Sequence, residues 1–306
     1  MISERLKRCS ALIRKRSKFL RDILPYRVVK AIKSGENKIT KKLKKMREIK
    51  NECKYENIYH VALQKTGTQW MFDVLSDPIV YEHSGMTVEK FDVPRRKSQS
   101  HPIRSLEEPY EKNTIITPFA GTHENYVNDV PKDDRRVAIF HVIRDPREMV
   151  VSWYFSTRDN HMVDKVSMLN AHRKNLKKKS KKEGLKYVID LFDWKGKFEV
   201  MRSWMNKRED DKIKTIKFEN LTEKSLVCFR GLFNFLDIRI PEDKLEDLVK
   251  SYSFETLTGR EKGEEDQSSH MRSGKSSTWR HHFDDELKDI FYNKAHDIVG
   301  GYGYEI

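Results

Sequence analysis

The fold of this chain is decided by the stretch Ile58-Tyr59-His60-Val61-Ala62-Leu63-Gln64-Lys65-Thr66-Gly67-Thr68-Gln69-Trp70. An apolar, strand-like run leads into a polar loop, and Met71–Leu75 then continues with helical spacing. Backbone N–H groups at such a loop and helix start point at an anion, and the lysine adds a formal charge. The pattern predicts a phosphate-binding loop, and the alternative is a polar turn that only solvates the connection. It is not a Walker A motif, because Lys65 precedes the single glycine.

The composition limits which classes of protein this chain can belong to. The chain has 306 residues, of which 37% are hydrophobic and 35% are charged, enough for one large domain or two small ones. No apolar run approaches the ~18 residues of a membrane span, and the N-terminus shows no secretory signal. The three cysteines lie far apart without metal-ligand spacing, which fits a reducing compartment. We therefore expect a cytoplasmic protein without a bound metal.

The net charge of +14 is concentrated in the first 52 residues, which hold 18 Lys and Arg against 5 Asp and Glu. The rest of the chain holds 43 basic against 42 acidic residues, which argues against specific nucleic-acid binding. We predict a basic, helical N-terminal arm over 1–52 and a second domain over 53–306. Amphipathic spacing in the arm is typical of a helix on an anionic membrane, and the alternative is a solvated helix packed loosely on the body.

Beyond the loop, strand-like and helix-like patterns alternate. Apolar runs predict further strands at Thr114–Pro118, Val137–Ile143 and Ile213–Phe218. Helical spacing occurs at Pro146–Thr157, Tyr187–Trp204, Lys224–Leu236, Asp243–Tyr252 and Asp284–Ile298, whereas 172–186 and Gly259–Lys275 are expected to be loops. The alternation predicts an α/β fold whose central parallel sheet is covered by helices on both faces. In such sheets ligands bind at the carboxyl ends of the strands, where Gln64–Trp70 would lie.

A second anion-binding pattern follows the third predicted strand. Arg144 stands at the strand end, where its planar guanidinium could bind a phosphate with two hydrogen bonds. Asp145 as N-cap, Pro146 at the first helical position and Glu148 at the third form a capping-box start. Ser152 lies two turns into the helix. The alternative is that Arg144 pairs with Asp145 or Glu148.

Together, Gln64–Trp70 and Arg144–Ser152 resemble the nucleotide-binding motifs of the cytosolic-type sulfotransferases that use 3′-phosphoadenosine-5′-phosphosulfate (PAPS). The first is similar to the family's 5′-phosphosulfate loop, Pro-Lys-Ser/Thr-Gly-Thr-Thr/Ser-Trp, and the second to its 3′-phosphate motif. Further segments resemble family motifs in the same order along the chain, namely Thr122-His123, Lys217–Leu221 and His270–Phe283. The resemblance covers about Ile58 to Tyr304 and implies a P-loop-like sulfotransferase fold for the domain over 53–306.

The resemblance implies in-line transfer of a sulfuryl group from PAPS to a hydroxyl or amine, without a metal, releasing 3′-phosphoadenosine-5′-phosphate (PAP). Lys65 would stabilise the departing phosphate, and His123 would act as general base. Glu124 and His83 are alternative bases. The implied nucleotide contacts are Lys65, Thr66, Gly67, Thr68 and Gln69 for the 5′-phosphate, Trp70, Phe218 and Phe254 around the adenine, and Arg144, Ser152, Arg272, Ser273 and Gly274 around the 3′-phosphate.

Five positions depart from the family pattern. Gln64 replaces a proline, Gln69 a hydroxyl residue, Phe218 a tyrosine and Ser273 a lysine, and Tyr252 stands where a threonine often lies. These substitutions bear on the affinity for PAPS more than on the reaction.

Two other classes of function stay open at this point. One is a P-loop-type nucleotide kinase, which would need Mg²⁺; the other is a non-catalytic protein that binds nucleotide, RNA or membrane. For a sulfotransferase, the acceptor is a small molecule or a glycan, and its wall and lid are expected from 81–113, 158–186 and 255–270. The sequence assigns no oligomeric state and leaves a homodimer open.

Overall fold

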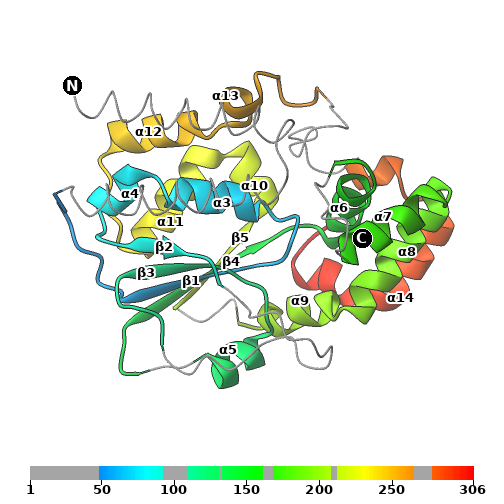
Figure 1. The fold of residues 1–306 in the computed structure, drawn as a ribbon, viewed down its shortest axis with the longest axis horizontal. Coiled ribbons are helices and arrows are strands. Elements are labelled where there is room, and N and C mark those ends of the chain that lie inside the picture. Colours follow the sequence, from blue (N-terminus) through cyan, green and yellow to red (C-terminus); the bar gives the residue numbers. More distant parts are fainter. Residues whose placement is uncertain (1–47, 92–108, 131–132, 161–167, 208–211, 265–277) are drawn as a thin grey trace. The chain divides into compact units, whose positions relative to one another are not determined.

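A computed structural model describes the chain except for residues 1–47, 92–108, 131–132, 161–167, 208–211 and 265–277 (Figure 1). The predicted basic arm therefore lies outside the described residues apart from its last five. Within these, the backbone N–H of Lys50 donates to the carbonyl oxygen of Glu82 at 2.8 Å. The division of the chain at residue 52 stays a prediction.

The centre of the body is a five-stranded, all-parallel sheet in the order β2-β3-β1-β4-β5. The strands are β1 (Asn57–Ala62), β2 (Thr87–Glu89), β3 (Thr114–Phe119), β4 (Val137–Ile143) and β5 (Ile213–Lys217). The predicted parallel α/β fold is confirmed. Among the described strands, the short edge strand β2 is the one that was not predicted, because three residues are too few to show a period.

Helices connect and cover the strands. They are α3 (Thr68–Leu75), α4 (Pro78–Glu82), α5 (His123–Asp129), α6 (Pro146–Phe155), α7 (Met168–Lys177), α8 (Lys181–Trp194), α9 (Lys197–Met205), α10 (Phe218–Glu223), α11 (Ser225–Phe235), α12 (Glu242–Ser251), α13 (Phe254–Thr258) and α14 (Asp285–Gly301). None of the helices within the described ranges has the length and apolar character needed to cross a membrane.

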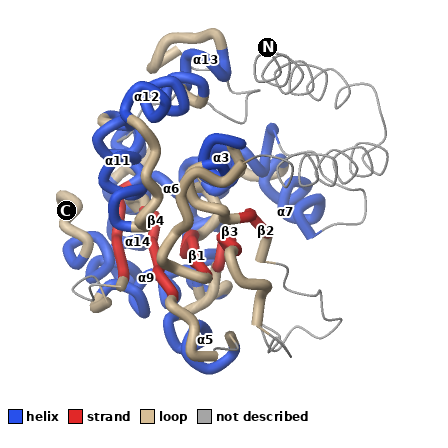
Figure 2. Tube along the Cα trace, turned by 90° about the vertical axis from the view of Figure 1, so that its left-hand side faces the viewer, coloured by secondary structure: helices blue, strands red, loops and turns tan. Residues whose placement is uncertain are grey.

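Two apolar layers enclose the sheet, as the alternating directions of strand side chains require. On one face Ile58 and Ala62 pack with α3, α11 and α12; on the other face Tyr59 and Val61 pack with residues of α5 and α9. Both views place α12 and α5 on opposite sides of the sheet (Figures 1 and 2). The prediction that helices cover both faces is therefore confirmed.

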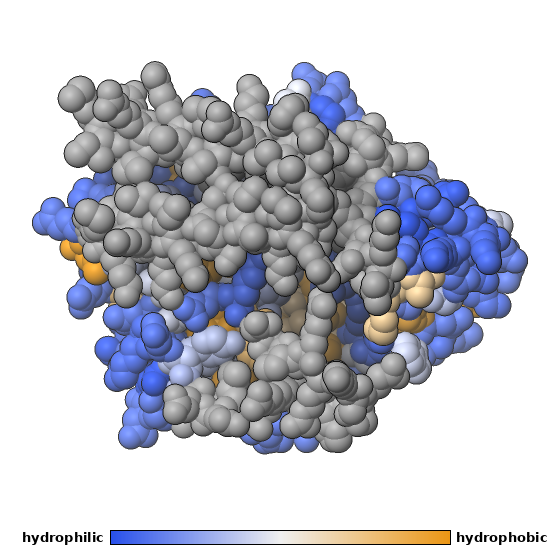
Figure 3. Space-filling model, viewed as in Figure 1, coloured by the Kyte–Doolittle hydropathy of each residue, from blue (hydrophilic) through white to orange (hydrophobic). Residues whose placement is uncertain are grey.

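The basic stretch 172–186, predicted to be a loop, is mostly helical. The prediction was wrong because the lysines obscured a capping box at the start of α8: Ser180 Oγ accepts from the N–H of Glu183 at 3.2 Å, and Glu183 Oε2 accepts from the N–H of Ser180 at 3.0 Å. Leu176 and Leu185 are fully buried, so the lysines face outward. The surface in the region of α7 and α8, on the right in Figure 3, is accordingly mostly hydrophilic.

A further difference concerns the predicted single helix Tyr187–Trp204. It divides at Gly196, whose left-handed backbone (φ 65°) ends α8 and starts α9 in a new direction. The break makes Lys197 the first residue of α9.

Candidate active site

The predicted site residues converge because they follow the carboxyl ends of neighbouring strands. Lys65 comes three residues after β1, and His123 four residues after β3. Arg144 and Phe218 directly follow β4 and β5. Since β3, β1, β4 and β5 are neighbours in that order, the four residues lie along one edge of the sheet, where parallel α/β sheets bind ligands.

The loop between β1 and α3 has a strained backbone suited to an anion. Lys65 (φ 77°) and Gly67 (φ 75°) are both left-handed, a conformation that costs a non-glycine residue about 1–2 kcal/mol and concentrates at functional sites. Inside the loop, Thr66 Oγ1 donates to the carbonyl oxygen of Leu63 at 2.7 Å. Gly67 is the N-cap of α3 and has no side chain to cap it, so the first N–H groups of the helix can donate to a bound anion.

Phe218 fixes the identity of the loop glycine. A Cβ atom at Gly67 would lie 2.6 Å from Phe218 Cε2, so no larger residue fits without displacing the ring. The same ring packs edge-on against Trp70, with centroids 6.4 Å apart, and the guanidinium carbon of Arg144 lies 4.8 Å from its centroid. Phe218 thus holds the loop, the start of α3 and the end of β4 together.

The two aromatic residues predicted to flank an adenine are connected through the end of α12. Trp70 Nε1 donates to the carbonyl oxygen of Tyr252 at 2.8 Å, and Phe254, two residues further on, is buried at the start of α13. Gln69 differs from its neighbours in the loop, because its exposed side chain donates to Asp73 Oδ1 at 3.0 Å along the outside of α3.

Arg144 contacts both the loop and a carboxylate. Its Nη1 donates to the carbonyl oxygen of Lys65 at 2.9 Å, and its Nη2 lies 3.4 Å from Glu148 Oε2. The pairing with Glu148 that the sequence left open is therefore present. Glu148 also accepts from the N–H of Trp279 at 2.6 Å, so its carboxylate is shared between Arg144 and Trp279. Among the described residues, the buried Nε of Arg144 has no partner and remains available to a ligand.

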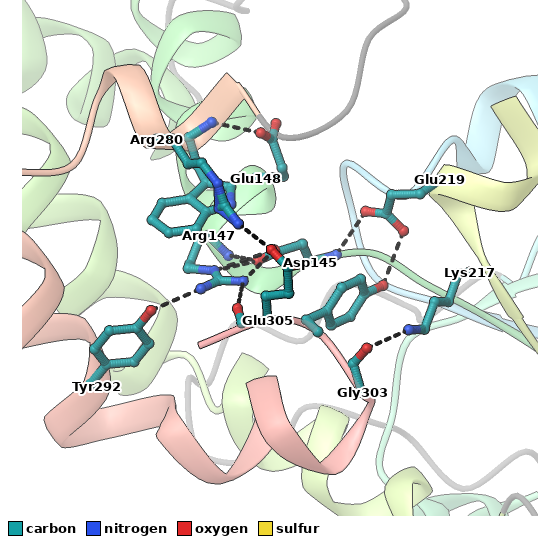
Figure 4. Close-up of polar contacts among 11 residues, drawn as sticks. Asp145, Arg147, Glu148, Lys217, Glu219, Arg280, Tyr292, Gly303 and Glu305 are labelled. Carbon is teal, nitrogen blue, oxygen red and sulfur yellow. Dashed lines mark hydrogen bonds and ion pairs between the residues drawn. The ribbon is translucent and has the colours of Figure 1, made fainter. Parts of the chain in front are cut away.

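Figure 4 shows the ion pair that fixes the start of α6. Asp145 caps the helix by accepting from the N–H of Arg147 at 2.9 Å, and its two carboxylate oxygens accept from Nε and Nη2 of the same arginine at 3.0 and 2.7 Å. The predicted N-cap and the proline at the first position are confirmed. The predicted return bond is wrong: the N–H of Asp145 donates to Glu219 Oε1 at 3.0 Å, because Glu148 is held by Trp279.

The segment 303–305 packs against this helix start. Arg147 Nη2 donates to the carbonyl oxygen of Glu305 at 2.6 Å, and Lys217 Nζ donates to that of Gly303 at 2.8 Å. Tyr304 donates its hydroxyl to Glu219 Oε2 at 3.0 Å, while burial raises the pKa of the Glu219 carboxyl. These contacts hold the residues that follow β4 and the end of β5 in place (Figure 4).

Helix α9 supports His123, the predicted base. The backbone N–H of His123 donates to Ser203 Oγ at 3.0 Å, and its ring lies edge-on to Trp204 with centroids 5.0 Å apart. Trp204 Nε1 also donates to the carbonyl oxygen of Gly121, at 2.9 Å. The half-buried imidazole is thus held at the end of β3 by two residues of one helix.

The structure separates the alternative bases. Glu124 directly follows His123 on α5 and is exposed. His83 is buried, and its Nδ1 lies 3.4 Å from Asn51 Nδ2. It precedes β2, whose first residue is paired with the first residue of β3, so His83 lies toward the amino ends of the strands, opposite the loop.

One lysine beside the loop was not predicted from the sequence. Lys197 Nζ donates to Gln64 Oε1 at 3.4 Å and lies 4.3 Å from the ring centroid of Phe192. Burial, followed by the charges of Arg144 and Lys197, lowers the pKa of Lys65 to about 8. Burial and the charge of Lys195 lower the pKa of Lys197 to about 8. No carboxylate of the described residues forms an ion pair with Lys65 or Lys197.

The other predicted site residues are less fully placed. Ser152 is half-buried on α6, whereas Arg272, Ser273 and Gly274 lie outside the described residues. Much of the predicted acceptor wall and lid also lies outside them. Within the described ranges, no group of three or more His, Cys, Asp or Glu side chains is arranged to hold a metal ion.

Known proteins resemble this chain in sequence and in fold. Residues 56–298 match the family described as "Sulfotransferase domain". The chain is 21% identical to Sulfotransferase 2A6 of Mus musculus over 264 residues, covering 81% of this chain and 86% of the relative. It is also 21% identical to the 3-beta-hydroxysteroid sulfotransferase of Cavia porcellus over 282 residues, covering 84% and 89%. The crystal structure of mouse sulfotransferase SULT7A1 complexed with PAP has a TM-score of 0.53 and 17% identity, covering 82% of this chain and 88% of that chain, which confirms the predicted fold.

Proposed function

Because the chain belongs to the sulfotransferase family, we propose that it transfers a sulfuryl group from PAPS to an acceptor hydroxyl or amine and releases PAP. The observation that carries the proposal is the order of side chains along the sheet edge. His123, Lys65 and Arg144 follow three neighbouring strands. A base, a binding loop for the transferred group and a second phosphate site would therefore lie side by side along the sheet edge. A nucleotide phosphorylated at both ends fits the last two.

The 5′-phosphosulfate would lie in the loop. The N–H groups of Thr68 and the residues after it would donate to the 5′-phosphate, while the ammonium of Lys65 would stabilise the charge that develops on the departing phosphate oxygen. The backbone of the loop is already in its strained form, so little reorganisation accompanies binding.

The 3′-phosphate would lie against Arg144. The unpartnered Nε and the neighbouring Nη atoms can donate to phosphate oxygens, and Ser152, in the second turn of α6, can add a hydroxyl. Trp70 and Phe254 would lie on either side of the adenine, near the corner between α12 and α13.

The chemical step is an in-line displacement at sulfur. The acceptor oxygen forms a bond to sulfur while the bond between sulfur and the 5′-phosphate oxygen breaks, and the electron pair of that bond stays on PAP. The acceptor proton passes to the imidazole of His123. General base catalysis contributes about 10²–10⁴-fold to such a step, and an electrostatic donor such as Lys65 contributes a comparable factor.

We propose a small molecule with a hydroxyl group as acceptor, supported by the name of the hydroxysteroid sulfotransferase relative. We also propose that the protein acts in the cytoplasm, since Cys53 and Cys228 are free thiols and sparse unpaired cysteines are typical of reducing compartments.

The test is transfer of labelled sulfate from PAPS to a panel of extracted metabolites, with EDTA present. We expect a labelled product that is absent with the Lys65→Ala variant. Activity that requires Mg²⁺ and ATP would instead identify a kinase. RNA binding with a steep salt dependence and no affinity for PAP would identify a non-catalytic binding protein.

A further inference from the structure

Lys197 stands in an unusual position for a lysine. It is the first residue of α9, where the partial positive charge of the helix N-terminus opposes a cation. It is half-buried, and within the described residues it has no ion pair; its one hydrogen bond goes to the neutral Gln64. A cation that is partly buried without a counter-ion destabilises the folded state. The position of Lys197 therefore lowers the stability of the protein.

The position of Lys197 is explained by the loop that lies beside it. Gln64, its hydrogen-bond partner, directly precedes Lys65 in the loop. The ammonium of Lys197 is close enough to contribute to the lowered pKa of Lys65. Two half-buried ammonium groups therefore lie near the same loop, an arrangement that an anion bound between them would stabilise.

Helix α9 also relates Lys197 to the base. Ser203 and Trp204, which hold His123, lie two helical turns after Lys197, or about 10 Å along the axis. The same helix thus places Lys197 beside the loop and holds His123 on the side where the acceptor would bind. The space between the loop and the base is where the sulfuryl group would be transferred.

We propose that Lys197 is a further catalytic residue, which contacts the non-bridging oxygens of the sulfuryl group during transfer. This inference rests on the proposed function. Lys65 serves the departing phosphate oxygen, whereas Lys197 would stabilise the charge on the equatorial sulfuryl oxygens, which is spread over all three in the transition state. Lys197 transfers no proton and forms no bond to sulfur.

PAP and PAPS distinguish this role from simple anion binding, because PAP lacks the sulfuryl group. We expect the Lys197→Gln variant to bind PAP with an affinity close to that of the wild type, while its single-turnover rate at saturating PAPS falls about 10²–10³-fold. Lys197→Arg, which keeps the charge, should retain more activity than Lys197→Gln. Removing the cation from the helix N-terminus should leave the unfolding midpoint unchanged or raise it. Lys197→Met serves as a second variant without the charge.

The matched control is Lys195→Ala. Lys195 lies two residues away and is exposed, with its ammonium over the ring of Trp194, so its removal should leave turnover near the wild-type value. Wild-type turnover in a folded Lys197→Gln or Lys197→Met variant would overturn the inference. So would a loss of PAP affinity equal to the loss of rate, which would make Lys197 a phosphate ligand. An absence of transfer from PAPS in the wild type and in Lys195→Ala would instead refute the proposed function.

Discussion

Arg144 donates a hydrogen bond from Nη1 to the backbone carbonyl of Lys65 at 2.9 Å. The carbonyl belongs to the strained residue of the loop, and the guanidinium belongs to the strand end that would hold the 3′-phosphate. The two proposed phosphate sites are therefore in direct contact in the protein without ligand. We expect the affinity for one phosphate to depend on the residue that holds the other.

Replacing Arg144 should weaken nucleotide binding and its preference for a 3′-phosphate. A charge-assisted hydrogen bond contributes about 1.5–3 kcal/mol, so Arg144→Ala should lower PAP affinity about 10–100-fold. Adenosine 5′-monophosphate, which has no 3′-phosphate, should lose less affinity in the same calorimetric titration. Arg144→Lys, which keeps the charge but not the planar fork, should be intermediate. Equal losses for both nucleotides would restrict the role of Arg144 to supporting the loop.

His123→Ala should abolish most of the turnover and leave PAP affinity unchanged, because the imidazole is assigned to the acceptor. We expect kcat to fall about 10²–10⁴-fold. His296→Ala is the control, since His296 is an exposed histidine on α14. Wild-type turnover in His123→Ala would transfer the role of base to Glu124.

Gly67→Ala should destabilise the loop through two separate effects. The left-handed backbone costs a residue with a Cβ about 1–2 kcal/mol, and the new methyl group would also meet the ring of Phe218. Gly259→Ala isolates the first effect, because Gly259 has a φ of 72° and, beyond its chain neighbours, no atom of the described residues lies within 4 Å of its added Cβ. The two variants should differ in how far their free energy of unfolding falls, and this difference measures the contact between the new methyl group and Phe218. Equal losses of stability would contradict that contact. PAP affinity should fall only for Gly67→Ala.

PAP affinity should decrease as the pH rises through about 8. The pKa of Lys65 in the unliganded protein is lowered to about 8, chiefly by burial, so the ammonium loses its proton there. A bound phosphate favours the protonated form, which means that binding takes up protons and weakens as protons become scarce. Calorimetry in two buffers of different ionisation enthalpy should detect this uptake, which Lys65→Arg should reduce. Constant affinity across this pH range would contradict the assignment of Lys65 to the phosphate.

Breaking the buried ion pair at the start of α6 should lower the stability of the whole body. Arg147→Met leaves the carboxylate of Asp145 buried without its partner, a change that costs about 3–5 kcal/mol. Arg280→Ala is the control, since its ion pair with Glu305 is exposed (Figure 4) and should contribute little. Chemical denaturation checks both variants, and a loss of stability as small for Arg147→Met as for Arg280→Ala would contradict the stabilising role of the buried ion pair.

The sequence predicted the parts of the site that local chemistry determines. Continuous apolar runs such as Val137–Ile143 identify buried parallel strands, and a strand followed by Lys65 and Gly67 identifies a loop that binds anions. These two features depend on neighbouring residues along the chain, which is why they could be predicted. The strand order, which places Arg144 next to that loop, comes from the structure.

Features that depend on packing between distant segments could not be predicted in this way. Lys197 is one lysine among many in this chain, and only the break at Gly196 directs it toward Gln64. The carboxylate that serves the N–H of Asp145 comes from Glu219, far along the chain, rather than from the nearby Glu148 that a capping box predicts. A local pattern gives the kind of hydrogen bond needed, and the tertiary fold decides which residue supplies it.

The contacts of residues 303–305 with Arg147, Lys217 and Glu219 have a consequence for biosynthesis. The ribosome adds these residues after every other part of the site, so a nascent chain can build the sheet and the loop before it can complete the start of α6. The complete start of α6, and with it the proposed 3′-phosphate site, should form only after residues 303–305 have been synthesised. A ribosome-bound chain stalled before Gly303 should therefore not retain PAP.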